Sequence, residues 1–84
     1  MLTVKYSKQA IKFLKKGDQK TAKRILRKIE GLQEDPFPKD TKRVEGYKEK
    51  TFRVRVGHLR ILSELDQQNN LLGIIKIDKR PNVY

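Results

Sequence analysis

Apolar and polar residues alternate along the segment 51–65, TFRVRVGHLRILSEL, except where Gly57 and His58 interrupt the pattern. This alternation predicts two antiparallel strands joined by a two-residue turn, with Gly57 supplying the positive φ of the first central position of a type II′ turn. The turn sets the register and places Arg55 opposite Arg60. Successive side chains point to opposite faces of a sheet. One face therefore carries Phe52, Val54, Val56, Leu59 and Ile61, and the other carries Arg53, Arg55 and Arg60.

The arginine face, defined by Arg53, Arg55 and Arg60, gathers three positive charges with little to neutralise them. Like charges directly opposite each other across an antiparallel pair are destabilising by about 0.2–1 kcal/mol. Only Glu64 and Thr51 are expected nearby to offset this repulsion. Two interpretations stay open: an anion binds here from outside, or the arginines form an ordinary solvated face of a basic chain.

The N-terminal half predicts a short strand and two helices. Residues 2–6 alternate as a strand does, and Ser7 is suited to cap a helix that ends before Gly17. Asp18 is suited to cap the second helix, because an apolar stripe follows it at helical spacing. The members of the stripe are Ala22, Ile25, Leu26, Ile29 and Leu32.

The other side of the second helix is strongly basic. This surface either keeps the protein soluble or docks onto a polyanion, and the pattern leaves both interpretations open. The residues concerned are Lys20, Lys23, Arg24, Arg27 and Lys28.

The rest of the chain predicts further strands. The prolines of the segment 34–38 end the second helix, and residues 40–47 are typical of a short strand entering a turn. Residues 71–77 predict a strand inside the sheet, with a possible bulge at Gly73. Along that strand Ile75 and Ile77 are expected on one side, and Lys76, Asp78 and Arg80 on the other.

This order of elements predicts one α+β domain spanning residues 1–84. Two N-terminal helices pack on one face of a mostly antiparallel, twisted sheet of four to five strands. The helices must cover the apolar face of the predicted hairpin. The arginine face is therefore expected to stay uncovered and to present its side chains to solvent.

Composition narrows the classes of partner and site. Lys and Arg number 21 against 10 Asp and Glu, and a net charge of +11 on 84 residues favours a polyanion, nucleic acid first. So small a domain buries only about 60–65% of its unfolded surface, so a surface site is expected. There is no cysteine, and the single histidine, His58, lies in the predicted turn. We expect no metal site, no cofactor and no membrane segment, and an intracellular, soluble protein.

Two segments together resemble a known family. FRVRVGHLRI at 52–61 and KIDKRPNVY at 76–84, in this order of elements, are similar to the RelE-type toxins of the RelE/ParE toxin-antitoxin superfamily. The resemblance covers essentially the whole chain. It implies a cytoplasmic toxin that cleaves mRNA in the ribosomal A site and inhibits translation, silenced by an acidic, RelB-like antitoxin in a hetero-oligomer.

The resemblance also implies catalytic residues. Arg53 and Arg55 take the places of the family's two basic strand residues, which are commonly lysines. Arg60 matches the arginine after the hairpin turn, Arg80 the arginine after the last long strand, and Tyr84 the tyrosine that closes the motif. Further candidates for contacts with RNA are Lys76, Lys79, Lys23 and Arg27.

The implied reaction is attack of a 2′-hydroxyl on the adjacent phosphodiester, giving a cyclic phosphate and a 5′-hydroxyl. Arg60 and Arg80 are expected to stabilise the transition state, where removing one preorganised donor costs about 2.7–4 kcal/mol by analogy with oxyanion holes. Arg53 and Arg55 are poor general bases, because arginine stays protonated in proteins. Tyr84 is therefore the candidate to act as acid or base, or to stack on the nucleotide.

Two alternatives stay open within the same superfamily. A ParE-like toxin inhibits a topoisomerase through protein contacts, and its arginines would serve only surface recognition. A catalytically inactive homologue would bind RNA or the ribosome without cleavage.

Overall fold

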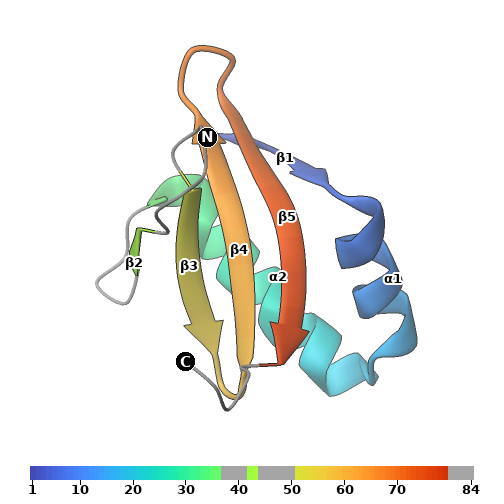
Figure 1. The fold of residues 1–84 in the computed structure, drawn as a ribbon. Helices are drawn as coiled ribbons and strands as arrows, with labels where there is room; N and C mark the ends of the chain where they lie inside the picture. Colours follow the sequence, from blue (N-terminus) through green and yellow to red (C-terminus); the bar gives the residue numbers. More distant parts are fainter. Residues whose placement is uncertain (37–41, 44–50, 80–84) are drawn as a thin grey trace.

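The computed structural model describes residues 1–36, 42–43 and 51–79 (Figure 1). One strand and then two consecutive helices form the N-terminal part of the chain, and the other strands follow in succession. The elements are β1 (Thr3–Tyr6), α1 (Lys8–Lys16), α2 (Gln19–Glu34), β2 (Lys42–Arg43), β3 (Thr51–Val56), β4 (Leu59–Asp66) and β5 (Leu71–Lys79). The strand predicted within residues 40–47 is present as β2, and the remainder of that segment lies outside the described residues.

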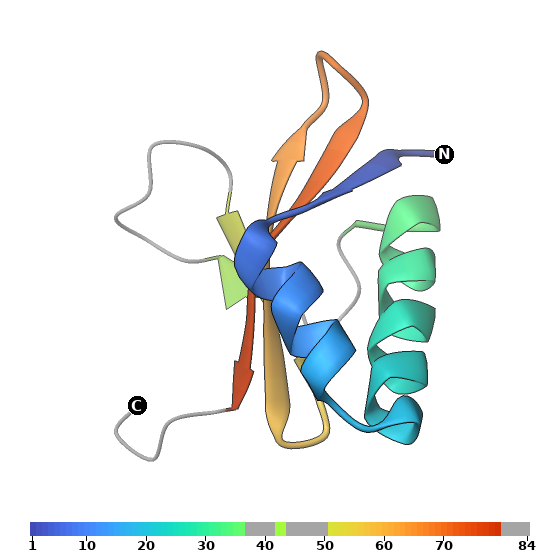
Figure 2. The same ribbon diagram turned by 90° about the vertical axis from the view of Figure 1, so that its right-hand side faces the viewer.

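The strands form one mixed sheet in the order β1-β5-β4-β3-β2. β1 runs parallel to β5, and the other neighbouring pairs are antiparallel. Both helices lie on the same side of the sheet, as the view turned by 90° makes plain (Figure 2). The predicted α+β class, with its mostly antiparallel sheet, is therefore confirmed.

Both predicted helix caps are present. Ser7 Oγ accepts a hydrogen bond from the Ala10 N–H at 3.1 Å and donates one to the Ile75 carbonyl at 2.6 Å. Asp18 Oδ1 accepts from the Thr21 N–H at 2.7 Å. Each cap satisfies a backbone donor that the first helical turn leaves unpaired. Ser7 in addition attaches the start of α1 to β5.

The core lies between the helices and the apolar face of the sheet. Leu26 belongs to the predicted apolar stripe of α2 but is 39% exposed, so the buried part of the stripe is narrower than predicted. The sheet touches only one side of the helix, and the outer edge of the stripe stays in contact with solvent. The buried apolar residues of this core are Ala10, Ile25, Ile29, Leu32, Val54, Ile61, Leu72, Ile74 and Ile77.

The predicted hairpin is confirmed in register and in turn. Val56 pairs with Leu59 and Arg55 with Arg60. Gly57 has a φ of +59°, as the first central position of a type II′ turn requires. The chain reversal therefore depends on a glycine at this position.

Replacing Gly57 by alanine is expected to lower the free energy of unfolding by about 1–2 kcal/mol, because left-handed backbone is costly for a residue with a Cβ. The added Cβ would also lie 2.9 Å from Arg24 Nη2. Urea denaturation of Gly57→Ala against His58→Ala measures the effect. His58 is exposed, so its variant should stay within about 0.5 kcal/mol of wild type. Equal losses in the two variants would contradict the strained-turn explanation.

The bulge in β5 does not fall at Gly73, where it was predicted. Gly73 pairs with Glu64, and the register shifts between Leu62 and Ser63, which leaves Ile75 as the extra residue. The bulge reverses the alternation, so Ile74 is buried in the core in place of Ile75. The side predicted for Ile75 was therefore wrong. Gly73 instead allows the Glu64 side chain to lie close to the backbone of β5, since a Cβ at Gly73 would be 3.0 Å from Glu64 Cγ.

The cap at Asp18 predicts a pH dependence of stability. The hydrogen bonds from Thr21 hold the pKa of Asp18 below its ordinary value of 3.8. A lowered folded-state pKa means that the stabilisation is present above pH 3.8 and is lost as the pH falls further. Asn caps a helix equally well but does not titrate. As the pH is lowered from about 5, the urea midpoint of wild type should therefore fall relative to that of Asp18→Asn. If the urea midpoints of the two proteins change with pH in parallel, this prediction is contradicted.

Candidate functional site

The arginine face is the side of the sheet that the helices leave uncovered (Figures 1 and 2). Across β3, β4 and β5, Arg55 pairs with Arg60, and Arg60 pairs with Asp78. One step along the strands on the same face, Arg53 pairs with Leu62, and Leu62 with Lys76. Three neighbouring strands thus bring four cationic side chains together.

The three arginines differ in their exposure to solvent. Arg55 is exposed and Arg53 is half-buried, whereas Arg60 is only 8% exposed. The prediction that all three point into solvent is therefore wrong for Arg60. Arg60 lies on β4, in the middle of the sheet, and has neighbours on both sides, whereas Arg53 and Arg55 lie on β3, near the edge.

Asp78 is a carboxylate beside the arginines that was not predicted from the sequence. Its Oδ1 lies 3.7 Å from Arg60 Nη2, and its Oδ2 lies 3.6 Å from Lys76 Nζ. Asp78 therefore lies between a buried cation and an exposed one. It reduces the repulsion between Arg55 and Arg60 that the hairpin register creates. The pairing of β4 with β5 brings Asp78 beside Arg60, and the register of that pair of strands could not be predicted from the sequence.

Counted over the residues that the structure describes, this face carries more cations than carboxylates. The cations Arg53, Arg55, Arg60 and Lys76 face the carboxylates Glu64 and Asp78. Guanidinium groups match the geometry of phosphate oxygens and bind them in pairs of hydrogen bonds. The arrangement is suited to bind a phosphodiester and to stabilise negative charge that develops on it.

The other predicted site residues fall in three places. Lys79 pairs with Leu59 and lines hollows beside α1, so its side chain lies on the helix side of the sheet. Lys23 and Arg27 are exposed on α2, within the helix layer. Of the predicted RNA contacts, only Lys76 shares the face of the hairpin arginines. The predicted residues Arg80 and Tyr84 lie outside the described residues and remain predictions.

Within the described ranges, no group of three or more His, Cys, Asp or Glu side chains is placed to hold a metal ion. None of the helices in the described part of the chain is long and apolar enough to cross a membrane.

Comparisons with known proteins agree on one superfamily. A family model described as the ParE toxin of the type II toxin-antitoxin system parDE matches residues 4–84. Comparison with curated proteins gave no match. Several solved structures are similar over nearly the whole chain, and they are toxins named RelE, alone or with RelB.

Three of these structures show which fold the chain has. The RelE–RelB complex of Pyrococcus horikoshii matches with a TM-score of 0.85 and 24% identity, covering 98% of each chain. The isolated Escherichia coli RelE toxin gives a TM-score of 0.81 at 15% identity, covering 100% of this chain and 92% of that one. The RelBE2 complex of Mycobacterium tuberculosis gives 0.79 at 22% identity, covering 94% and 98%. The fold is therefore RelE-like, as the sequence predicted.

Proposed function

This chain belongs to the ParE toxin family of type II toxin-antitoxin systems and has a RelE-like fold. From that fold and from the arginine face, we propose that it is a ribosome-dependent endoribonuclease that cleaves mRNA in the A site. The observation that carries the proposal is the arginine face. Among its described residues, this open surface holds more cations than carboxylates, and it suits a phosphodiester better than a protein surface of mixed charge.

The proposed reaction needs no external nucleophile. The 2′-hydroxyl oxygen attacks the neighbouring phosphorus, the bond from phosphorus to the 5′ oxygen breaks, and the products carry a 2′,3′-cyclic phosphate and a 5′-hydroxyl. The 2′-hydroxyl loses a proton and the leaving oxygen gains one. Negative charge builds up on the phosphoryl oxygens in the transition state, and guanidinium groups stabilise it.

Arg60 is proposed to supply the fixed charge of this site. It is buried in the middle of the face and lies beside Asp78, so its position is set before RNA arrives. A preorganised cation needs no reorganisation as charge develops, which is the condition under which electrostatic stabilisation is largest. Arg55 and Arg53 are more accessible and are proposed to hold the RNA backbone, and Arg80 is proposed to act with Arg60.

Proton transfer is proposed to involve Tyr84. The described part of the arginine face offers arginine, lysine and carboxylate side chains, and arginine does not deprotonate in proteins. Tyr84 is the motif-matched residue that can exchange a proton or stack on a base.

We propose that the partners are the ribosome with its bound mRNA and a cognate acidic antitoxin. RelB accompanies the similar RelE toxins of Pyrococcus horikoshii and Mycobacterium tuberculosis. A chain with a net charge of +11 repels itself, and an acidic antitoxin in a toxin–antitoxin hetero-oligomer would neutralise it. We place the complex in the cytoplasm, where ribosomes are available.

A second candidate function is inhibition of a topoisomerase. The family match to ParE toxins over residues 4–84 favours it, as does arginine at positions 53 and 55, where the RelE-type pattern commonly has lysine. In that case the arginine face would contact protein and not RNA.

Pulse labelling after induction separates these candidates. Cells expressing the chain receive labelled methionine or labelled thymidine at short intervals. Cleavage of mRNA predicts that methionine incorporation falls first, and that Arg55→Ala slows the fall more than Lys20→Ala, an exposed control on α2. An early fall in thymidine incorporation, with altered plasmid supercoiling, would contradict the proposal and favour the topoisomerase. Arrested translation with intact mRNA would indicate an inactive, ribosome-binding homologue.

A further inference from the structure

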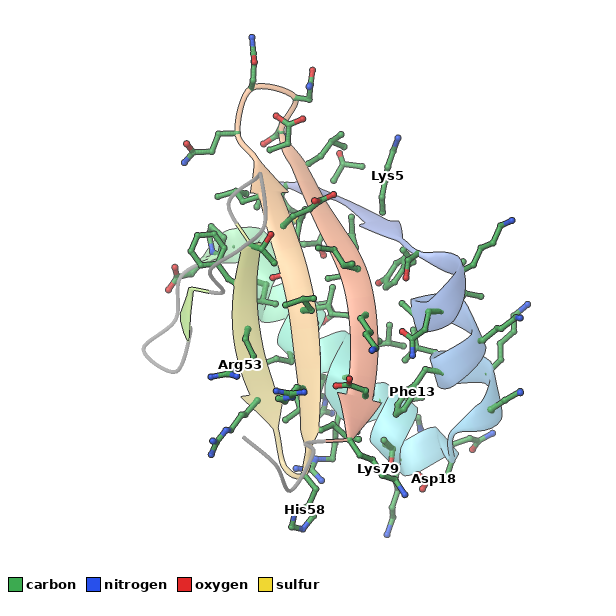
Figure 3. The ribbon with its side chains drawn as sticks, viewed as in Figure 1. Lys5, Phe13, Asp18, Arg53, His58 and Lys79 are labelled. Carbon is green, nitrogen blue, oxygen red and sulfur yellow. The ribbon has the colours of Figure 1, made fainter. Side chains whose placement is uncertain are left out.

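The Asp78 carboxylate lies on the arginine face, next to the buried cation of the candidate site. Asp78 pairs with Arg60 across β4 and β5, so the two side chains share this face of the sheet. Figure 3 views the face from the side opposite the helices, with Arg53 labelled on β3 and Lys79, which follows Asp78, at the end of β5. The site therefore holds a proton-accepting oxygen as well as positive charge.

The proposed cleavage needs a group that accepts the proton of the 2′-hydroxyl. Arginine does not deprotonate in proteins, so Arg53, Arg55 and Arg60 cannot accept it. Lys76 carries an ammonium group, which has three donors and no acceptor until it loses a proton. An ionised carboxylate accepts hydrogen bonds through both of its oxygens. On the described part of this face, a carboxylate is therefore the side chain suited to take the proton.

The two described carboxylates of this face differ in their distance from Arg60. Asp78 Oδ1 is 3.7 Å from Arg60 Nη2. Glu64 lies four residues further along β4, which at about 3.3 Å per residue places it about 13 Å from Arg60. The Glu64 side chain also lies against Gly73. A phosphate held by Arg60 is thus within reach of Asp78 and beyond the reach of Glu64.

The Asp78 carboxylate is accessible to a substrate. Its side chain is 32% exposed, and its Oδ2 lies 3.6 Å from Lys76 Nζ. Charge-assisted hydrogen bonds between such groups are about 2.7–2.9 Å long, so the contacts with Arg60 and Lys76 are both longer than a hydrogen bond. The two cations hold the carboxylate by their charge, and its oxygens keep lone pairs for a further donor.

The distance between Asp78 and Arg60 suits general-base catalysis. A phosphate oxygen bound by a guanidinium lies about 2.7–2.9 Å from its nitrogen, and an attacking oxygen lies about 3–3.5 Å from the reacting atom. A general base must lie about 2.6–3.2 Å from the attacking oxygen. A carboxylate 3.7 Å from the guanidinium can therefore contact the 2′-hydroxyl of a nucleotide whose phosphate binds Arg60.

We propose that Asp78 is the general base of the cleavage reaction, an inference that rests on the proposed function. An Asp78 oxygen takes the proton of the 2′-hydroxyl as the 2′ oxygen bonds to phosphorus and the bond from phosphorus to the 5′ oxygen breaks. The 5′ oxygen takes its proton from a separate donor, for which Tyr84 is proposed, and Asp78 then releases its proton to water. The bound phosphate adds negative charge beside Asp78, which makes the carboxylate a better proton acceptor.

A purely structural role for Asp78 fits these observations less well. A carboxylate that only fixes Arg60 would stabilise it most with short hydrogen bonds in a buried position. Asp78 is instead 32% exposed, and its contact with Arg60 measures 3.7 Å. Both observations favour a role that needs contact with the substrate, in addition to the charge that Asp78 offers Arg60.

Single-turnover cleavage of mRNA on programmed ribosomes tests the proposal. Asp78→Asn should slow cleavage by about 10²-fold or more, because general bases contribute about 10²–10⁴-fold. Glu64→Gln makes the same change in charge on the same face and should stay within about threefold of wild type. Equal rates of Asp78→Asn and wild type would overturn the proposal, as would equal slowing in the two variants. If wild type itself leaves the mRNA intact, the proposed function is contradicted, and this inference with it.

Chemical rescue of Asp78→Ala separates a base from a counter-ion. Imidazole at about pH 8 supplies an uncharged base, whereas nitrate supplies a planar anion that hardly accepts protons. At equal ionic strength, imidazole should restore the rate by about tenfold or more, and nitrate should not. Restoration by nitrate alone, or by neither additive, would overturn the proposal. Urea denaturation establishes that the Asp78 and Glu64 variants are folded.

Discussion

Replacing Arg60 by lysine is expected to slow RNA cleavage by about 10²–10³-fold while the affinity for RNA changes little. Lysine keeps the charge but loses the planar fork of donors that matches phosphate oxygens. Arg60 is 8% exposed, so its main contribution is fixed charge at the reacting phosphate and not capture of RNA. Single-turnover cleavage of mRNA on programmed ribosomes, with RNA affinity measured separately, checks both parts.

The control for this prediction is Arg55→Lys. Arg55 pairs with Arg60 across the hairpin but is exposed, so a flexible ammonium can replace its contact with the RNA backbone. Its loss in cleavage rate should stay within about tenfold. Equal slowing of the two variants would show that the face acts through net charge, and an unchanged rate in Arg60→Lys would remove Arg60 from the site. Urea denaturation establishes that both variants are folded.

Replacing Asp78 by asparagine is expected to lower the free energy of unfolding by about 1–3 kcal/mol, because a buried arginine loses a nearby carboxylate. The estimate lies below the usual cost of breaking a fully buried pair, because the Asp78 side chain is 32% exposed and the atoms are 3.7 Å apart. The variant also gains one net positive charge, so RNA should bind more tightly and with a steeper dependence on salt.

Lys76→Gln is the matched control for Asp78→Asn. It removes the second cation that lies near Asp78 among the described residues, but the Lys76 side chain is 55% exposed, so the expected loss of stability is within about 0.5 kcal/mol. A double-mutant cycle between Arg60 and Asp78 should give a coupling energy of about 0.5–3 kcal/mol. A coupling near zero would contradict the view that Asp78 holds Arg60 in position.

The hairpin could be predicted because its information is local. Period-two alternation on either side of Gly57 sets the strands, the turn and the register together, and the structure has that register residue for residue. The caps at Ser7 and Asp18 are local in the same sense. Each of these features depends on residues within a few positions of one another.

The centre of the site could not be predicted in the same way. The pairing of Arg60 with Asp78 depends on how β4 meets β5, and the bulge at Ile75 shifts that register within the strand. An extra residue in a strand leaves no reliable mark in the alternation of a segment as apolar as this one. The burial of Arg60 follows from its place on the central strand, which is a property of the whole sheet.

The hollows beside α1 depend on contacts that are distant in sequence. Phe13 and Lys79 line them from α1 and from the end of β5, and the parallel pairing of β1 with β5 sets where α1 begins. The sequence placed Lys79 with the RNA contacts because it precedes Arg80. In the fold its side chain lies across the sheet from Lys76, since alternation continues to the end of the strand.

The most direct test is incubation of the purified chain with ribosomes carrying a defined mRNA, followed by mapping of the cut and of the product ends. We expect a break within the A-site codon, with a 2′,3′-cyclic phosphate on one product and a 5′-hydroxyl on the other. With Arg60→Lys, both products should form about 10²–10³-fold more slowly. The proposed cleavage would be contradicted if the chain binds ribosomes but leaves their mRNA intact, while the same preparation blocks a topoisomerase.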